Sequence, residues 1–408
     1  MRLKWGSVLT TSLVVAALFT AFNAEADKDS TSKDSNKKTD IPKFVVDPYW
    51  PKPLPNRWVT GEVGGICVDS NDHIFGINRR NVTALETTVG KIPAPPVIEY
   101  GVDGGIVNTW GDPNVLPLAI HGCFVDAHDN VWIAGSGGGM VQKWSHDGGT
   151  LLLQIGSRTV CDGPNGACGA PGLNSSTGTL NDPADIAVDP KNGDVYIADG
   201  YGNYRVVVFD SKGKYLRQWG SPGTGPGQFQ PNGGGHPHCV VMGKDGLLYV
   251  CDRGNDRVQV FKKDGTLAKI ILVKPGTGYV PAPDGTPGRR AVGSVLDVDF
   301  SVDSVQKYMY VADTGNEVLW IFDRPSATNI GGFGSQGHNA GNWTLLHMLA
   351  TDSQGRLYTS ETVDGRRLQR FLPDGFVRQG ELDTYLGTPH YQPFPKNLSG
   401  GNIKDDDN

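Results

Sequence analysis

The chain has 408 residues, of which 38% are hydrophobic and 20% are charged, and its formal net charge is −6. This length suits one large domain or two ordinary ones. The sequence contains no basic stripe, which argues against a nucleic-acid partner, since such partners are held through their phosphates by clustered Lys and Arg. Glycine is in excess, with 56 residues, and this favours many short strands and tight turns over helices.

Residues 1–26 have the pattern of a secretory signal peptide. Arg2 and Lys4 form a positive start, residues 8–22 are mostly apolar, and residues 24–26 (AEA) offer a cleavage site. The apolar run is shorter than the ~20 residues that a membrane-spanning helix needs. We therefore expect an exported protein, periplasmic or secreted, that has no membrane contact after signal cleavage.

Polar segments are predicted on both sides of one folded domain. Residues 27–43 are expected to be a disordered linker, because residues 27–40 contain no apolar side chain. Residues 381–408 are expected to be a C-terminal extension that ends in the acidic tail NIKDDDN. The folded domain is then expected over residues 44–380.

Six related units follow one another within this domain. Each has an apolar run opened by an aromatic residue, then an Asp/Gly turn and further apolar runs, as in residues 187–220, AVDPKNGDVYIADGYGNYRVVVFDSKGKYLRQWG. The six aromatics are Phe75, Trp132, Tyr196, Tyr249, Tyr310 and Tyr358. Such units are typical of propeller blades, so the sequence predicts an all-β fold, a six-bladed β-propeller. The segment FVVDPYW near Phe44 would complete the last blade and close the ring; the alternative is an open all-β sandwich array.

Six cysteines permit disulfides in an exported chain. Cys161 and Cys168 flank the segment DGPNGA and are the best candidate pair. Free buried cysteine is common in apolar strand-like runs, and three cysteines lie in such runs: Cys67, Cys123 and Cys239. Cys239 and Cys251 could also face each other across one hairpin.

Three histidines occupy the same register in alternate repeats. His121, His238 and His347 each lie eleven residues before the aromatic of repeats two, four and six. In a closed ring these repeats would aim three imidazoles at one axis, which predicts a tripod metal site. Three turn histidines, by contrast, are expected to face solvent: His73, His128 and His146.

Residues just after the second strand of a blade should share the channel mouth with the start of the first strand. Arg79, Tyr201 and Arg253 occupy this position, four or five residues past the aromatic. Imidazole suits zinc best, with copper, iron or nickel as alternatives, and three protein ligands leave a fourth position open. Two arginines suit a carboxylate, and Tyr201 is a candidate proton acceptor. We expect a small-molecule or peptide substrate that carries a carboxylate.

At these residues the chain resembles the peptidyl-α-hydroxyglycine α-amidating lyases, which are six-bladed propellers related to the NHL-repeat proteins. The resemblance spans roughly residues 61–371, and its most specific pieces are GEVGGICVDSNDHIFGINRR, HGCFVD, PHCVVMGKDGLLYVCDRGNDRVQVF and LLHMLATD. It implies zinc bound by His121, His238 and His347, a catalytic Tyr201, and substrate binding by Arg79 and Arg253. It also implies cleavage of the C–N bond of an α-hydroxyglycine to give an amide and glyoxylate.

The sequence departs from this family at two positions. Met348 stands where the family has an Asp that helps bind a structural calcium, which argues against calcium held by backbone carbonyls at Ile66 and Cys123. Leu345 stands where the family has a methionine. No copper monooxygenase domain is present in this chain, so the substrate could also be a small carbinolamide.

Two other functions fit the predicted scaffold. A metal-dependent hydrolase or lactonase would bind its metal through Glu, Asn and Asp, and the histidine tripod argues against it. A non-catalytic NHL-repeat binding protein would tolerate replacement of all three histidines. A monomer is expected in each case.

Overall fold

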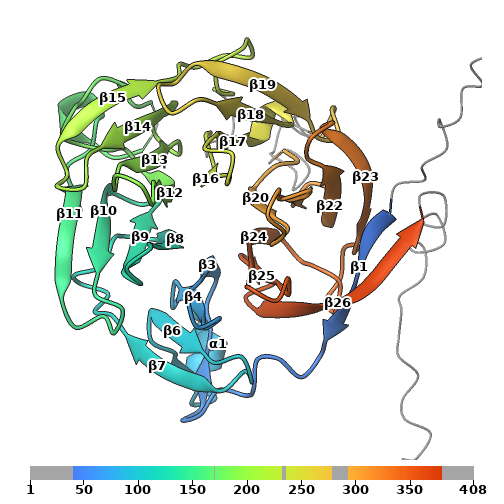
Figure 1. Cartoon of the computed structure of the whole chain (residues 1–408). Coiled ribbons are helices and arrows are strands. Elements are labelled where there is room, and N and C mark those ends of the chain that lie inside the picture. The colour runs from blue at the N-terminus through green and yellow to red at the C-terminus, as the bar shows by residue number, and fades with distance from the viewer. Residues whose placement is uncertain (1–39, 170, 232–235, 278–292, 379–408) are drawn as a thin grey trace, which may run out of the picture. The chain divides into compact units, whose positions relative to one another are not determined.

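The computed structural model describes residues 40–169, 171–231, 236–277 and 293–378. Within these ranges the strands form six four-stranded antiparallel sheets arranged as a ring of blades around a central channel (Figure 1). The prediction of an all-β, six-bladed β-propeller is confirmed.

Each blade is an antiparallel meander whose first strand lines the channel and whose fourth strand lies at the rim (Figure 1). Blade 1 consists of β3 (Val63–Val68), β4 (Ile74–Asn78), β6 (Val97–Tyr100) and β7 (Ile106–Trp110). Blade 2 consists of β8 (Ile120–Val125), β9 (Val131–Gly135), β10 (Gly139–Trp144) and β11 (Leu151–Ser157). Blade 3 consists of β12 (Pro183–Val188), β13 (Val195–Asp199), β14 (Arg205–Phe209) and β15 (Tyr215–Trp219). Blade 4 consists of β16 (Val240–Met242), β17 (Leu248–Asp252), β18 (Arg257–Phe261) and β19 (Leu267–Leu272). Blade 5 consists of β20 (Asp297–Phe300), β21 (Tyr308–Asp313), β22 (Val318–Asp323) and β23 (Thr328–Phe333). Blade 6 consists of β24 (Leu346–Thr351), β25 (Leu357–Glu361), β26 (Leu368–Arg378) and β1 (Asp40–Asp47).

Two short strands and one short α-helix lie outside the six four-stranded sheets. Strands β2 (Trp58–Val59) and β5 (Ile92–Pro93) form a parallel pair, and helix α1 (Ala84–Thr88) lies between them in sequence. The helix starts at a capping box in which the Thr83 side chain accepts from the backbone of Glu86. α1 and β5 belong to the connection between β4 and β6 of blade 1, whereas β2 precedes β3.

The core lies between the blades. Six clusters of buried apolar side chains each join two neighbouring blades, as where Ile77 of β4 packs with Val131 and Ile133 of β9. The aromatic that marks each repeat lies in the second strand of its blade and is buried in all six blades. A single blade therefore leaves apolar surface exposed on both faces, and the ring buries both.

The ring closes through strands from distant parts of the chain. β1 pairs antiparallel with β26, with Ile41 opposite Val377 and Val46 opposite Phe371. The prediction that the segment near Phe44 completes the last blade is confirmed. Because β1 begins at Asp40, residues 40–43 belong to a strand, and the predicted end of the disordered linker at residue 43 was wrong. Ile41 is buried in the apolar cluster between blades 5 and 6.

All six cysteines form disulfides. The predicted pair Cys161–Cys168 is present, and Cys239, the residue before β16, is bonded to Cys251 of β17 across the hairpin. The third disulfide, Cys67–Cys123, joins the first strands of blades 1 and 2, with 5.6 Å between the Cα atoms. The prediction of free thiols in the strand-like runs was therefore wrong, because the first strands converge on the channel more closely than their separation in sequence indicates. Three disulfides indicate an oxidising compartment outside the cytoplasm.

The predicted signal peptide, residues 1–26, and the C-terminal extension, residues 381–408, lie outside the described residues. Among the described residues, no helix combines the length and apolar character required to cross a membrane.

Candidate metal centre and substrate site

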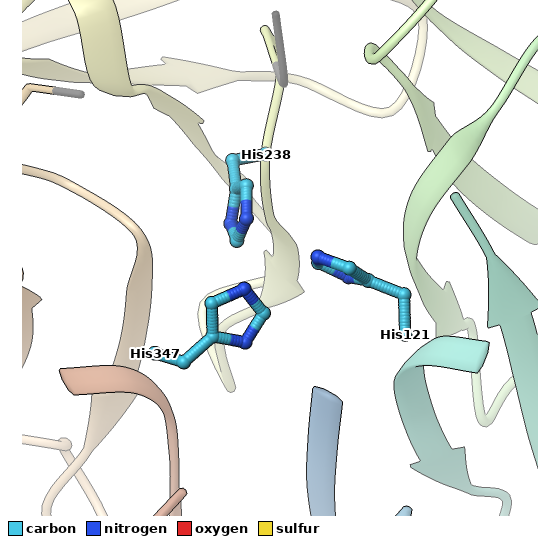
Figure 2. Close-up of side chains that lie close together, drawn as sticks. All are labelled: His121, His238 and His347. Carbon is cyan, nitrogen blue, oxygen red and sulfur yellow. The ribbon is translucent and has the colours of Figure 1, made fainter. Parts of the chain in front are cut away.

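The three register histidines meet at the centre of the ring (Figure 2). His121 is the second residue of β8, His347 is the second residue of β24, and His238 lies two residues before β16. The ring centroids are 4.9 Å apart for His121 and His238, 4.6 Å for His121 and His347, and 5.0 Å for His238 and His347. One ring nitrogen of each lies within 4.8 Å of the others, so the three side chains could hold one metal ion.

The next blade fixes the orientation of two of these imidazoles. Nδ1 of His121 bonds to the carbonyl oxygen of Ala184 at 2.8 Å, and Nδ1 of His238 bonds to that of Leu296 at 2.7 Å. Nδ1 of His347 makes no hydrogen bond of ordinary geometry. Burial lowers the pKa of His347, and a contact with the backbone of Gly64 in blade 1 offsets a small part of this lowering. A carbonyl accepts only from a protonated nitrogen, so Nε2 of His121 and His238 presents a lone pair to the centre.

Burial keeps the three imidazoles neutral. His121 and His238 are fully buried and His347 is 3% exposed, and loss of hydration holds the pKa of all three well below its ordinary value. The guanidiniums of Arg79 and Arg253 lower these values further, Arg79 at His121 and His347, Arg253 at His238 and His347. Neutral imidazole is the form that binds a metal.

The hydroxyl of Tyr201 reaches the centre of the tripod. Its oxygen lies 3.0 Å from Nε2 of His121 and 3.1 Å from Nε2 of His238, and Nη1 of Arg253 donates to it at 3.4 Å. The hydroxyl has one proton and can donate to only one of the two nitrogens, so the other contact brings two lone pairs together. A divalent cation bound by these nitrogens removes this conflict, and the donor set therefore fits a metal ion.

Arg79 belongs to the same group of side chains but is held from two sides. Its Nε donates to the carbonyl oxygen of Ile120 at 3.1 Å, and its Nη1 pairs with Glu62 at 2.5 Å. Ile120 directly precedes His121, so blade 1 presents the guanidinium beside the tripod through this contact. No sequence pattern pointed to Glu62, because it lies before the first strand of blade 1 and outside the repeat register.

Below the tripod the channel contains a cavity of about 180 Å³ lined by the first strands of all six blades. Buried Asp185 accepts from the backbone nitrogen of Val240 at 3.0 Å, and buried Asp297 accepts from that of Leu349 at 2.9 Å. The first contact joins blade 3 to blade 4, and the second joins blade 5 to blade 6. Neither carboxyl group was predicted from the sequence. Met348 is buried in an apolar cluster and offers the channel no oxygen ligand.

Comparison with known proteins places the chain in a family. A profile of the NHL repeat matches residues 180–209 and 235–261. Peptidyl-α-hydroxyglycine α-amidating lyase 2 of Drosophila melanogaster is 33% identical over 345 residues, which covers 81% of this chain and 75% of that protein. The chain belongs to the family of NHL-repeat propellers that includes this lyase.

Other similar proteins match this chain over different shares of their own length. NHL repeat-containing protein 3 of Mus musculus is 27% identical, covering 81% of this chain and 85% of that protein. Peptidyl-glycine α-amidating monooxygenase A of Xenopus laevis is 29% identical, covering 74% of this chain but 36% of that protein. Among solved structures, a streptogramin B lyase matches with a TM-score of 0.50 and 13% identity, covering 81% of this chain and 98% of that chain, and this likeness shows the fold alone.

Proposed function

We propose that the protein is a zinc-dependent lyase that cleaves the C–N bond of an α-hydroxyglycine-type carbinolamide and releases an amide and glyoxylate. The observation that carries the proposal is the position of the Tyr201 hydroxyl between two imidazole nitrogens and beside Arg253. A proton acceptor, cationic side chains and a candidate metal tripod thus lie at one point of a buried channel mouth. Similarity to the fly lyase supports the same chemistry.

The side chains divide the reaction between them. Arg79 and Arg253 would bind the substrate carboxylate, since guanidinium groups match its geometry. A zinc ion on the three histidines would supply a Lewis acid for the substrate oxygen. The Tyr201 oxygen, once its own proton has passed to solvent, would accept the proton of the α-hydroxyl. The oxygen electron pair then forms the carbonyl of glyoxylate as the C–N bond breaks, and the amide nitrogen regains that proton from Tyr201.

Release of glyoxylate from an N-acyl-α-hydroxyglycine tests this proposal. Tyr201→Phe removes the proton acceptor and keeps the ring, so we expect kcat to fall by roughly 10²- to 10⁴-fold. Tyr204→Phe is a matched control, because its hydroxyl bonds to the carbonyl of Pro231, away from the tripod. The proposal fails if both variants release glyoxylate at the wild-type rate, or if the wild-type protein releases none.

Metal content gives a second test of the same site. His121→Ala is expected to lose one equivalent of zinc by elemental analysis together with glyoxylate release. The alternative function is a non-catalytic NHL-repeat binding protein, because the mouse relative is named for its repeats and not for an activity. Under that alternative, His121→Ala would leave both the zinc content and the fold unchanged.

A further inference from the structure

A second cluster of histidines and carboxylates lies in blades 1 and 2. Nδ1 of His73 is 2.7 Å from Oε1 of Glu99 and 3.5 Å from Oδ2 of Asp69, and Nε2 of His146 is 2.8 Å from the same Asp69 oxygen. Ligand atoms of Asp69, Glu99 and His146 all lie within 4.8 Å of one another. His73 and His146, predicted to face solvent, are therefore partly buried in polar contacts, and that prediction was wrong.

This cluster is separate from the tripod. His73 precedes β4, whereas Arg79 follows β4, and five strand residues span roughly 17 Å. The cluster thus lies at the opposite end of blade 1 from the channel mouth. His146 reaches it from the turn between β10 and β11 of blade 2.

The two carboxylates are buried without a permanent positive charge. Asp69 is 6% exposed and Glu99 is 2% exposed. In the part of the chain that the structure describes, no Lys or Arg forms an ion pair with either of them. Backbone nitrogens of Asn71 and His73 donate to Oδ1 of Asp69, which directs Oδ2 at the imidazoles.

Other blades carry a cation at this position. The corresponding turn aspartates of blades 2, 3 and 6 are Asp126, Asp189 and Asp352, and they pair with Lys143, Lys263 and Arg356. Lys263 lies in the turn between β18 and β19 of blade 4, so it occupies the place that His146 occupies in blade 2. Blade 1 has exchanged a fixed cation for two imidazoles and gained a second buried carboxylate.

We propose that Asp69, His73, Glu99 and His146 bind a divalent transition-metal ion, with zinc as the ion that suits two imidazoles and two carboxylates. The ion would neutralise both buried carboxylates and accept a lone pair from each imidazole. Tetrahedral zinc with bonds of about 2.0–2.1 Å places its ligand atoms roughly 3.3 Å apart. The observed pairs lie near this value, at 2.7 Å for His73 and Glu99, 3.5 Å for His73 and Asp69, and 2.8 Å for His146 and Asp69. The site stands independently of the lyase activity and, at the junction of two blades, would join them.

Zinc titration of the chelator-treated full chain tests the second site. We expect two equivalents in the wild-type protein and one in Glu99→Gln or His146→Lys. The lysine variant copies the Asp189–Lys263 pair, so it should fold while losing the ion. Asp189→Asn is the matched control, since it alters the corresponding aspartate of another blade and should keep two equivalents.

The two metal sites fail in distinguishable ways. If the wild-type protein binds one equivalent that His121→Ala loses and His146→Lys keeps, the second site is overturned and the cluster consists of hydrogen-bonded side chains alone. If His146→Lys and Glu99→Gln both keep two equivalents, the second site is overturned as well. If a single equivalent is lost in His146→Lys and kept in His121→Ala, the second site stands and the tripod proposal fails. Near-wild-type thermal melts of His146→Lys in chelator exclude misfolding as the cause of a loss.

Discussion

Tyr201 lies near His238 because the glycine before it lets two segments of the chain approach each other closely. It follows β13 by two residues, and its backbone nitrogen donates to the carbonyl of Asp182 at 3.1 Å. A Cβ atom on Gly200 would lie 1.9 Å from the carbonyl oxygen of Pro237, so only glycine permits this approach of blade 3 to the segment that carries His238. The absence of a side chain at Gly200 therefore allows the Tyr201 phenol to approach His238.

The same kind of contact predicts the effect of Gly122→Ala. The new Cβ would lie 2.4 Å from the Ala184 oxygen, which is the atom that holds Nδ1 of His121. We expect a destabilisation of about 1–3 kcal/mol from the clash and a 10- to 100-fold loss of zinc affinity at the tripod, measured by urea unfolding and zinc titration.

Gly178→Ala is the control for this substitution, because a Cβ at Gly178 meets nothing within 4 Å. Equal zinc affinity in the two variants would show that the Ala184 carbonyl does not position His121.

The raised pKa of buried Asp313 predicts how the free energy of unfolding depends on pH. Asp199, Asp252 and Glu361, near the ends of the second strands of blades 3, 4 and 6, each pair with an arginine of the same blade. Asp313 of blade 5 instead accepts from Trp320 Nε1 at 2.7 Å and from Asn316, and burial raises its pKa from 3.8 to about 6.

Asp313→Asn should therefore change the pH profile of unfolding. Between pH 4 and 6 the folded protein keeps a proton on Asp313 that the unfolded chain has lost, so the wild-type free energy of unfolding falls as pH rises through this window. We expect the variant to gain on the order of 3 kcal/mol relative to wild type between pH 4 and pH 7, measured by denaturant unfolding. Parallel pH profiles would contradict the raised pKa.

At the scale of the strands, the repeat register was enough to predict the blades and the tripod. The position of a residue relative to its buried aromatic fixes its height along the first strand, and alternate blades then place His121, His238 and His347 on one axis. Contacts between blades could not be predicted this way. The Cys67–Cys123 pair and the His146–Asp69 contact depend on distances between neighbouring sheets, which strand periodicity does not contain.

The disulfide between blades 1 and 2 should contribute more stability than the local one. Cys67–Cys123 closes a sequence separation of 56 residues and Cys161–Cys168 closes 7, and the loss of unfolded-state entropy grows with loop length. Replacing both cysteines by Ala should cost about 4 kcal/mol for the first pair and about 2.5 kcal/mol for the second. Denaturant unfolding of the two double variants measures this difference, and the reverse order would contradict the loop argument.

At the scale of the whole molecule, closure depends on β1. Phe44 is buried between blades 5 and 6, with its ring centroid 5.6 Å from those of Tyr310 and Phe333. The last blade consists of three strands from residues 346–378 and one from residues 40–47, so the ring is held at this point by a single strand pairing.

Phe44→Ala should therefore weaken the entire ring. We expect a loss of about 3–5 kcal/mol in the free energy of unfolding, as for other buried phenylalanines. Tyr49→Ala, at a side chain that is 83% exposed, should change stability by less than about 0.5 kcal/mol. A loss of similar size in both variants would show that β1 does not close the ring.

Closure by β1 has a consequence for the order in which the metal centre matures. His347 lies on β24, the innermost strand of the sheet that β1 completes at its outer edge. The third histidine of the tripod therefore belongs to a blade that is complete only when strands from both ends of the described chain have met. Binding energy from an ion at the tripod would then be available only to molecules with a complete ring, so the ion would stabilise the closed ring and not its incomplete precursors.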